Sequence, residues 1–307
     1  MTPRLPNHAP DNPGHPFETS KYSVLMSLYG RERPEFLRSA LDSMIGQSIP
    51  PDEIVLVEDG PLPDTLHEVV REYSSRGHGR FQILVNPSNL GLGPSLRKGV
   101  ETCRNELIAR MDTDDIALHD RCGKQLLYFA SHPATAILGG QIQEFVDSPD
   151  VPVGRRQVPE SDADLKKFLR KRCPFNHMTV MFKKSAVLAA GNYRDWFWNE
   201  DYDLWIRLAL GGCVFANLPD VLVFTRVGGE MYARRGGLKY FLSECRIQMF
   251  MKDNRLVSWP LFLVNCLKRF VVELLLPARL RSWVFQTFAR APVPLEKEEH
   301  LPSGGRP

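Results

Sequence analysis

Several common sequence features are missing from this chain of 307 residues. Its six cysteines form no CxxC pair, and a chain of this length needs no disulfide framework, so a reducing compartment is expected. The first twenty residues are polar and proline-rich and lack the apolar core of a signal peptide. The formal net charge of +3 is small and gives no reason to expect a nucleic-acid partner.

The usual nucleotide-binding motifs are also missing. The loop Gly91-Leu92-Gly93 lacks the third glycine of the dinucleotide fingerprint, because Leu96 occupies that place. The chain contains no GxxxxGK[ST] phosphate loop. These absences argue against a dehydrogenase and against a P-loop NTPase.

Short apolar runs alternate with helical patterns through the first half of the chain. Strands are expected at 22–28, 53–57, 81–85 and 107–111, and helices at 34–47, 66–73 and 94–103. This alternation predicts an α/β fold with a mostly parallel sheet flanked by helices. The second half is less regular, and we expect helices at 162–172 and 201–210 and strands at 178–182 and 221–225.

Two acidic clusters carry the most information. Asp112-Thr113-Asp114-Asp115 follows an apolar strand, and Glu200-Asp201 opens a predicted helix. Crowded carboxylates repel one another and are costly to desolvate, so a bound cation best explains the first cluster. Oxygen ligands favour Mn²⁺ or Mg²⁺, which usually brings phosphates with it. A solvated turn and a dipole-stabilised helix start are the plain alternatives for the two clusters.

Three polar strand ends are expected to meet at one edge of the sheet. They are Ser27-Leu28-Tyr29, Glu58-Asp59-Gly60 and the Asp112 cluster. Ligands of parallel α/β sheets bind outside the carboxyl ends of the strands. Taken alone, Tyr29 and His177 fit structural roles, and the basic residues Arg226, Arg234 and Arg235 fit a solvated loop as well as a phosphate site.

Taken in order, these segments resemble the family 2 glycosyltransferases of the GT-A fold. The matching string is 23–29, then Val57-Glu58-Asp59-Gly60, Asn89-x-Gly91, 111–115 and 200–205. Segments 110–115, 174–182 and 234–237 look like a narrower group that contains the amylovoran-type exopolysaccharide galactosyltransferases of bacteria.

The resemblance implies roles at matching positions. Asp201 would be the catalytic base, supported by Glu200, and Tyr29 would stack on uracil while Asp59 accepts a hydrogen bond from it. The metal ligands would be Asp114, Asp115 and His177. The remaining nucleotide-sugar contacts would come from Ser27, Glu58, Asn89, Gly91, Asp112, Asp114, Arg226, Arg234 and Arg235.

The chain departs from the family pattern in two places. Glu58-Asp59 replaces the usual pair of aspartates, and Arg97 stands where the family often has asparagine. The QxxRW signature of processive synthases is absent, which favours transfer of one sugar per encounter.

The resemblance further implies the substrates and the location. The donor would be a UDP-sugar, galactose or another hexose, transferred with inversion. The acceptor would be a glycan linked to polyprenyl diphosphate, in exopolysaccharide or cell-surface polysaccharide synthesis. The enzyme would be cytoplasmic and peripheral on the inner face of the cytoplasmic membrane. A nucleotidyltransferase and a non-catalytic sugar-nucleotide or polysaccharide binding module are the rival functions at this point.

The C-terminal region mixes apolar and basic residues. Lys268, Arg269 and Glu273 interrupt its apolar segments, so no clean run of ~20 apolar residues exists and a spanning helix is not expected. Such a composition suits helices that lie in the membrane interface, although helices packed on the catalytic domain would explain it as well. We expect a disordered arm (1–20), a GT-A domain (21–250), a helical extension (251–290) and a disordered tail (291–307).

Overall fold

The computed structural model describes residues 21–77, 79–196, 198–228, 236–277 and 280, and it confirms the α/β fold. Each strand and helix expected in the first half is present within a few residues. The bounds are β1 (Tyr22–Tyr29), α1 (Pro34–Ile45), β2 (Glu53–Asp59), α2 (Asp64–Arg76), β3 (Phe81–Asn86), α3 (Leu92–Thr102) and β4 (Leu107–Met111).

The second half contains more strands than the sequence pattern predicts. Its elements are β5 (Ile116–Ala117), α4 (Arg121–Ser131), β6 (Thr135–Phe145), β7 (Pro152–Arg156), α5 (Asp162–Leu169), the 3₁₀ turn η1 (His177–Thr179), β8 (Met181–Lys183), α6 (Lys184–Ala189), α7 (Glu200–Leu210) and β9 (Val214–Arg226). The strand expected at 178–182 was placed too early, because η1 precedes it. The strand expected at 221–225 is the end of the longer β9.

One mixed sheet joins both halves. Its order is β3-β2-β1-β4-β8-β6-β9-β5, with β7 on the edge of β6. Strands β1 to β4 pair in parallel, whereas β8 runs antiparallel to both β4 and β6. The parallel half therefore has its carboxyl ends at one edge, where the first acidic cluster lies.

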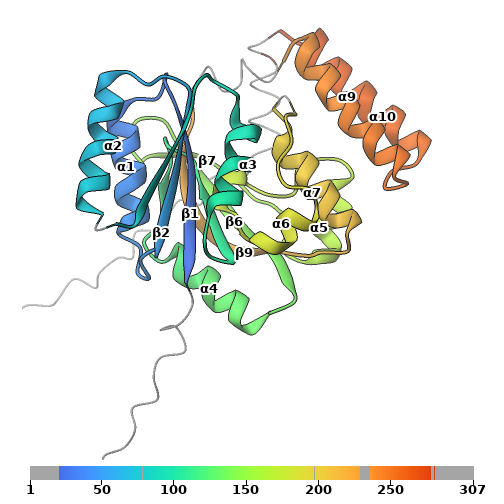
Figure 1. Ribbon diagram of the computed structural model, residues 1–307. Coiled ribbons are helices and arrows are strands. Elements are labelled where there is room, and N and C mark those ends of the chain that lie inside the picture. Colours follow the sequence, from blue (N-terminus) through green and yellow to red (C-terminus); the bar gives the residue numbers. More distant parts are fainter. Residues whose placement is uncertain (1–20, 78, 197, 229–235, 278–279, 281–307) are drawn as a thin grey trace, which may run out of the picture.

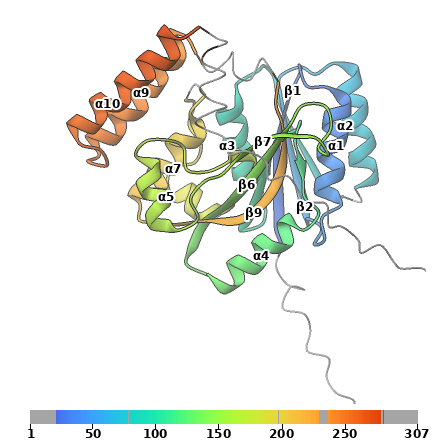
Figure 2. The same cartoon turned by 180° about the vertical axis from the view of Figure 1, so that it is seen from behind.

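Helices cover both faces of the sheet (Figures 1 and 2). Successive residues of a strand point to opposite faces, so β1 supplies Val24 and Met26 to one core and Leu25 to the other. The first core includes residues of α1, α2 and α4. The second includes residues of α3, α5 and α7. This second core holds α7 against the sheet and so fixes the position of Glu200 and Asp201.

A helical pair follows the sheet domain. Helix α9 (Leu238–Asp253) packs on α10 (Trp259–Arg269), which continues into the π-helical turn η2 (Phe270–Leu275). The pair stands beside α7 (Figure 1). Ile247, Met251 and Phe262 belong to the second core, so these helices pack partly on the domain. No helix among the described residues is long and apolar enough to cross a membrane.

Some predictions fall on parts of the chain that are not described. The expected N-terminal arm, the tail 291–307, Arg234 and Arg235 all lie outside the described residues. The domain boundaries near 250 and 290 stay predictions.

Candidate active site

The carboxyl ends of β1, β2 and β3 lie side by side. Tyr29 pairs with Asp59, and Asp59 pairs with Asn86 on the next strand. Met26 pairs with Met111, so the first acidic cluster begins beside the end of β1. Tyr29 is 39% exposed and is open to a planar ligand at this edge. The structure therefore brings together the three polar strand ends singled out in the sequence.

Asp59 organises the loop that follows β3. Its two carboxylate oxygens accept hydrogen bonds from the backbone N–H groups of Leu90 (2.8 Å) and Gly91 (2.9 Å). The side-chain amide of Asn86 donates to the same carboxylate at 3.2 Å. Asn86 was not among the predicted site residues, although a polar residue at a strand end could have flagged it. Asp59 is thus a structural anchor as well as a predicted base contact.

Gly60 permits this loop to approach β2 closely. Its φ of +89° lies in the left-handed region, and a Cβ there would meet the backbone nitrogen of Asn89 at 2.6 Å. Asn89 in turn donates from its side-chain amide to the carbonyl of Asp59 at 3.3 Å. Glycine after Glu58-Asp59 is therefore required by the backbone, whatever ligand binds.

Two other residues predicted to contact the sugar nucleotide, Glu58 and Ser27, differ in burial. The Glu58 side chain is buried, and that burial raises its pKa, while His67 lies 3.8 Å from it. Ser27 is half-buried one residue after Met26 on β1.

The first acidic cluster forms a compact group of oxygen atoms. Ligand atoms of Asp112, Asp114 and Asp115 all lie within 4.8 Å of one another. Burial, together with the charges of Asp112 and Glu32, raises the pKa of Asp114 to about 7. Burial and the charges of Asp114 and Asp112 raise the pKa of Asp115 well above its usual value. A bound cation would relieve the repulsion among these carboxylates, and their oxygen atoms are suitable ligands for a hard divalent metal.

Arg226, at the end of β9, contacts this cluster. Its backbone N–H donates to Asp115 at 2.8 Å, and its Nε donates to the carbonyl of Asp114 at 3.3 Å. Its guanidinium lies over the rings of Phe36 at 3.8 Å and Phe145 at 4.6 Å. Arg226 therefore lies against the acidic cluster, and its role as a contact to the sugar-nucleotide donor stays a prediction.

Glu32 is a site residue that the sequence reasoning missed. Thr113 Oγ1 donates to its carboxylate at 2.9 Å, which brings the loop after β1 onto the acidic cluster. Burial raises the pKa of Glu32, and the charge of Asp112 raises it further. No local pattern marks this residue, because its importance comes from a contact across 81 positions.

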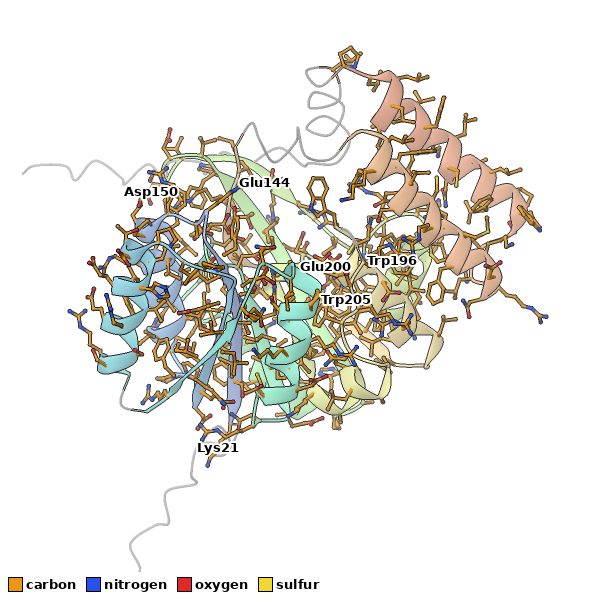
Figure 3. All side chains as sticks on the ribbon, turned by 45° about the horizontal axis from the view of Figure 1, so that its top comes forward. Lys21, Glu144, Asp150, Trp196, Glu200 and Trp205 are labelled. Carbon is orange, nitrogen blue, oxygen red and sulfur yellow. The ribbon has the colours of Figure 1, made fainter. Side chains whose placement is uncertain are left out.

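The second acidic cluster begins α7. Asp201 accepts hydrogen bonds from the backbone N–H of Tyr202 at 2.7 Å and from the thiol of Cys173 at 3.4 Å. Burial raises the pKa of Asp201, and burial with the charge of Asp201 raises the pKa of Glu200 to about 8. Figure 3 labels Glu200 near the start of α3, where a Cβ on Gly93 would lie 3.2 Å from the Cβ of Glu200.

Arg110 connects the two acidic clusters. It is only 2% exposed and forms a two-pronged ion pair with Asp112, at 2.6 Å and 2.5 Å. Its charge also lowers the pKa values of Glu200 and Asp201, partly opposing their burial. The charge of one buried cation therefore acts on both clusters.

His177 occupies a different part of the site. Its Nε2 lies 2.9 Å from the hydroxyl of Tyr193. Burial lowers its pKa well below the usual value, and Arg110 adds to this effect, so the ring is neutral. Among the described residues, the group of ligand atoms within 4.8 Å comprises the three aspartates without His177. Its assignment as a metal ligand stays a prediction.

A cavity of about 670 Å³ opens beside Glu200 and Asp201. Its walls come from segment 171–178, the start of α7, and the helices α9, α10 and η2. The cavity therefore lies between the sheet domain and the helical pair, and Asp201 faces it.

Residues 23–189, more than half of the chain, match the family described as Glycosyl transferase family 2. The chain belongs to this family. The enzyme is therefore a glycosyltransferase, which sets aside the nucleotidyltransferase and the non-catalytic binding module.

Named relatives of this glycosyltransferase cover nearly the whole chain. The amylovoran biosynthesis glycosyltransferase AmsE of Erwinia amylovora is 37% identical over 271 residues, covering 86% of this chain and 98% of the relative. The UDP-Gal:alpha-D-GlcNAc-diphosphoundecaprenol beta-1,3-galactosyltransferase of Escherichia coli is 32% identical over 273 residues, covering 89% and 98%. The predicted likeness to amylovoran-type enzymes is confirmed.

The fold also matches solved glycosyltransferase structures. The S. aureus TarS 1–349 in complex with UDP-GlcNAc superposes with a TM-score of 0.61 at 17% identity, covering 82% of this chain and 72% of that chain. At this identity the likeness shows the GT-A fold alone.

Proposed function

We propose that this glycosyltransferase transfers a hexose, with galactose as the first candidate, from a UDP-sugar to a hydroxyl of a lipid-linked glycan. The observation that carries the proposal is the buried Arg110, which pairs with Asp112 of the oxygen-rich cluster and whose charge lowers the pKa of Asp201 in the second carboxylate pair. Such an arrangement suits a diphosphate on one side and an acceptor hydroxyl on the other. The relative that uses UDP-Gal supports the choice of sugar.

The donor would lie along the carboxyl ends of β1 and β2. Tyr29 would stack on the uracil ring. Asp59 would accept a hydrogen bond from uracil, because its carboxylate oxygens keep free lone pairs after they accept hydrogen bonds from the loop that follows β3. Ser27, Glu58, Asn89, Gly91 and Arg226 would surround the nucleotide and sugar.

A divalent Mn²⁺ or Mg²⁺ would be held by the acidic cluster. The residues fit such an ion, because three carboxylates converge within 4.8 Å and supply only oxygen. Bound there, the metal supplies Lewis-acid stabilisation of the charge that develops on the leaving diphosphate. Asp114 and Asp115 are the proposed ligands together with His177, and Asp112 also contacts Arg110.

Asp201 would act as the general base. Its carboxylate takes the proton of the acceptor hydroxyl as that oxygen forms a bond to the anomeric carbon. The bond from that carbon to UDP breaks, and its electron pair leaves with UDP, so the configuration inverts. Glu200 would support the base, since its raised pKa of about 8 keeps it protonated and uncharged near neutral pH.

The pathway and location follow from the acceptor. We infer a role in exopolysaccharide or cell-surface polysaccharide synthesis, supported by the amylovoran relative. A lipid-linked acceptor requires the enzyme to work at the inner face of the cytoplasmic membrane. Exposed apolar side chains on α10 and η2, among them Leu263, Leu267 and Leu275, support peripheral attachment there.

Sugar transfer from a panel of UDP-sugars tests this proposal. The acceptor is α-D-GlcNAc-diphosphate with an alkyl tail, and product and UDP are measured with Mn²⁺, with Mg²⁺ and with EDTA. We expect one UDP-hexose to give metal-dependent product of inverted configuration. Product formation that survives EDTA, or a product of retained configuration, would contradict the proposal.

A further inference from the structure

The cavity beside Asp201 has an uneven distribution of charge. The carboxylates Glu200 and Asp201 come from the start of α7, whereas Lys171 and Lys268 come from the segment after α5 and from α10. Both lysines are exposed, and within the described residues neither amine has an ion-pair or hydrogen-bond partner. Two cations without a partner among the described residues therefore line the same cavity as the base.

The other charged groups that line the cavity beside the lysines are already engaged. Arg269 pairs with Glu244 at 2.5 Å, and Arg156 donates to the carbonyls of Phe175 (3.1 Å) and Cys173 (2.8 Å). Glu273 also lines the cavity and is buried. Arg172 lines it too, and its guanidinium lies over the ring of Phe168 at 6.0 Å. The two lysines are therefore the cavity's cations whose amines have no partner among the described residues.

The backbone contacts of Lys171 connect it to the base. Cys173 donates to Asp201 at 3.4 Å, and Arg269 donates to the carbonyl of Lys171 at 3.1 Å. Two residues of extended chain span at most about 7 Å, so the Cα atom of Lys171 lies within about 7 Å of the Cα atom of Cys173, the residue that contacts the base.

An apolar surface continues beyond the lysines. Val272 lines the cavity, and Leu267 and Val271, which are near it in sequence, are exposed. An amphiphile with an anionic group at the lysines could thus lay its alkyl chain on this surface.

We propose that Lys171 and Lys268 bind the diphosphate of the acceptor, an inference that rests on the function proposed above. The sugar attached directly to that diphosphate then presents its hydroxyl to Asp201, and the lipid follows α10 and η2. The enzyme accordingly adds the second sugar of a lipid-linked glycan. Its substrate must come from a reaction that transfers a sugar phosphate onto a polyprenyl phosphate.

The test measures binding of octyl diphosphate by isothermal titration to the full chain with saturating UDP and Mn²⁺, which fill the donor site. Octyl β-glucoside, which has no diphosphate, reports binding by the alkyl chain alone. The Lys171→Ala/Lys268→Ala variant is compared with Lys167→Ala, an exposed lysine on α5 outside this cavity. UDP binding and thermal unfolding are recorded for each protein.

We expect wild type and Lys167→Ala to bind octyl diphosphate equally and the double variant to bind it at least about tenfold more weakly, because charge-assisted hydrogen bonds are lost. UDP binding and unfolding should be the same in all three. Equal octyl diphosphate affinity in all three proteins, or no binding by wild type, would overturn the inference while leaving the proposed function standing. Wild type that fails to bind UDP would contradict the proposed function and the inference together.

Discussion

Asp201 is the residue on which the proposed chemistry depends most. Asp201→Asn keeps the shape and the backbone hydrogen bond but removes the proton acceptor. We expect kcat to fall by about 10²–10⁴-fold with unchanged UDP-sugar affinity, the usual scale for loss of a general base. Steady-state kinetics and a donor titration separate the two effects. The matched control is Asp195→Asn, which changes an exposed carboxylate before α7. If Asp201→Asn also loses affinity for the UDP-sugar, Asp201 binds the UDP-sugar and is not the base.

Cys173 is a positioning residue for this base. Its thiol hydrogen bond lowers the pKa of Asp201, while burial raises it. A base works only when ionised, so kcat rises as pH rises through that pKa. Cys173→Ala should move this acidic limb to higher pH, and the pH profile of kcat measures the shift. Cys213→Ala, with a half-buried thiol outside the cavity, should leave the limb in place. If the acidic limb of the kcat profile stays in place in Cys173→Ala, the thiol does not tune the base and contributes only to packing.

At the scale of elements, the approach of α3 to α7 decides where the second acidic cluster lies. Gly93→Ala would place a Cβ against the carbonyl of Arg194 and beside Glu200. We expect the free energy of unfolding to fall by about 1–3 kcal/mol, as in overpacked cores, with a lower kcat. Denaturant unfolding measures the first effect. Gly211→Ala is the control, since its Cβ would make only ordinary contacts at 3.5 Å. Equal stability of the two variants would contradict this account.

The elements also show how far the sequence could predict the fold. The parallel half was predictable because each strand is a short apolar run and is followed by a helix whose apolar residues recur at helical spacing. Strand β6 was not, because Gly139, Gly140 and Gln141 interrupt its apolar pattern and its pairing with β8 and β9 is long-range. The same limit applies to the site. Strand-end carboxylates stand out locally, whereas Glu32, Arg110 and Cys173 gain their roles only from contacts made after folding.

At the scale of the whole molecule, the outer face of the helical pair should bind an anionic membrane. Leu263 and Leu267 are 60% and 63% exposed there. Leu263→Asp/Leu267→Asp adds charge to an apolar face, so co-sedimentation with vesicles rich in phosphatidylglycerol should drop. Leu127→Asp, on α4 with 52% exposure, is the control for an added charge elsewhere. Equal sedimentation of both variants and wild type would exclude this face as the attachment site.

The attachment of α10 to the segment after α5 has a consequence for engineering. Asn265 donates to the carbonyl of Arg170 at 3.0 Å, and Arg269 donates to that of Lys171 at 3.1 Å. Two residues later in the chain, Cys173 contacts Asp201. The C-terminal helices are therefore not an exchangeable anchor, because replacing them with a foreign anchor removes the donors that hold the chain next to the base. A chimera that still uses the acceptor therefore has to retain Asn265 and Arg269 together with the residues that bind the lipid.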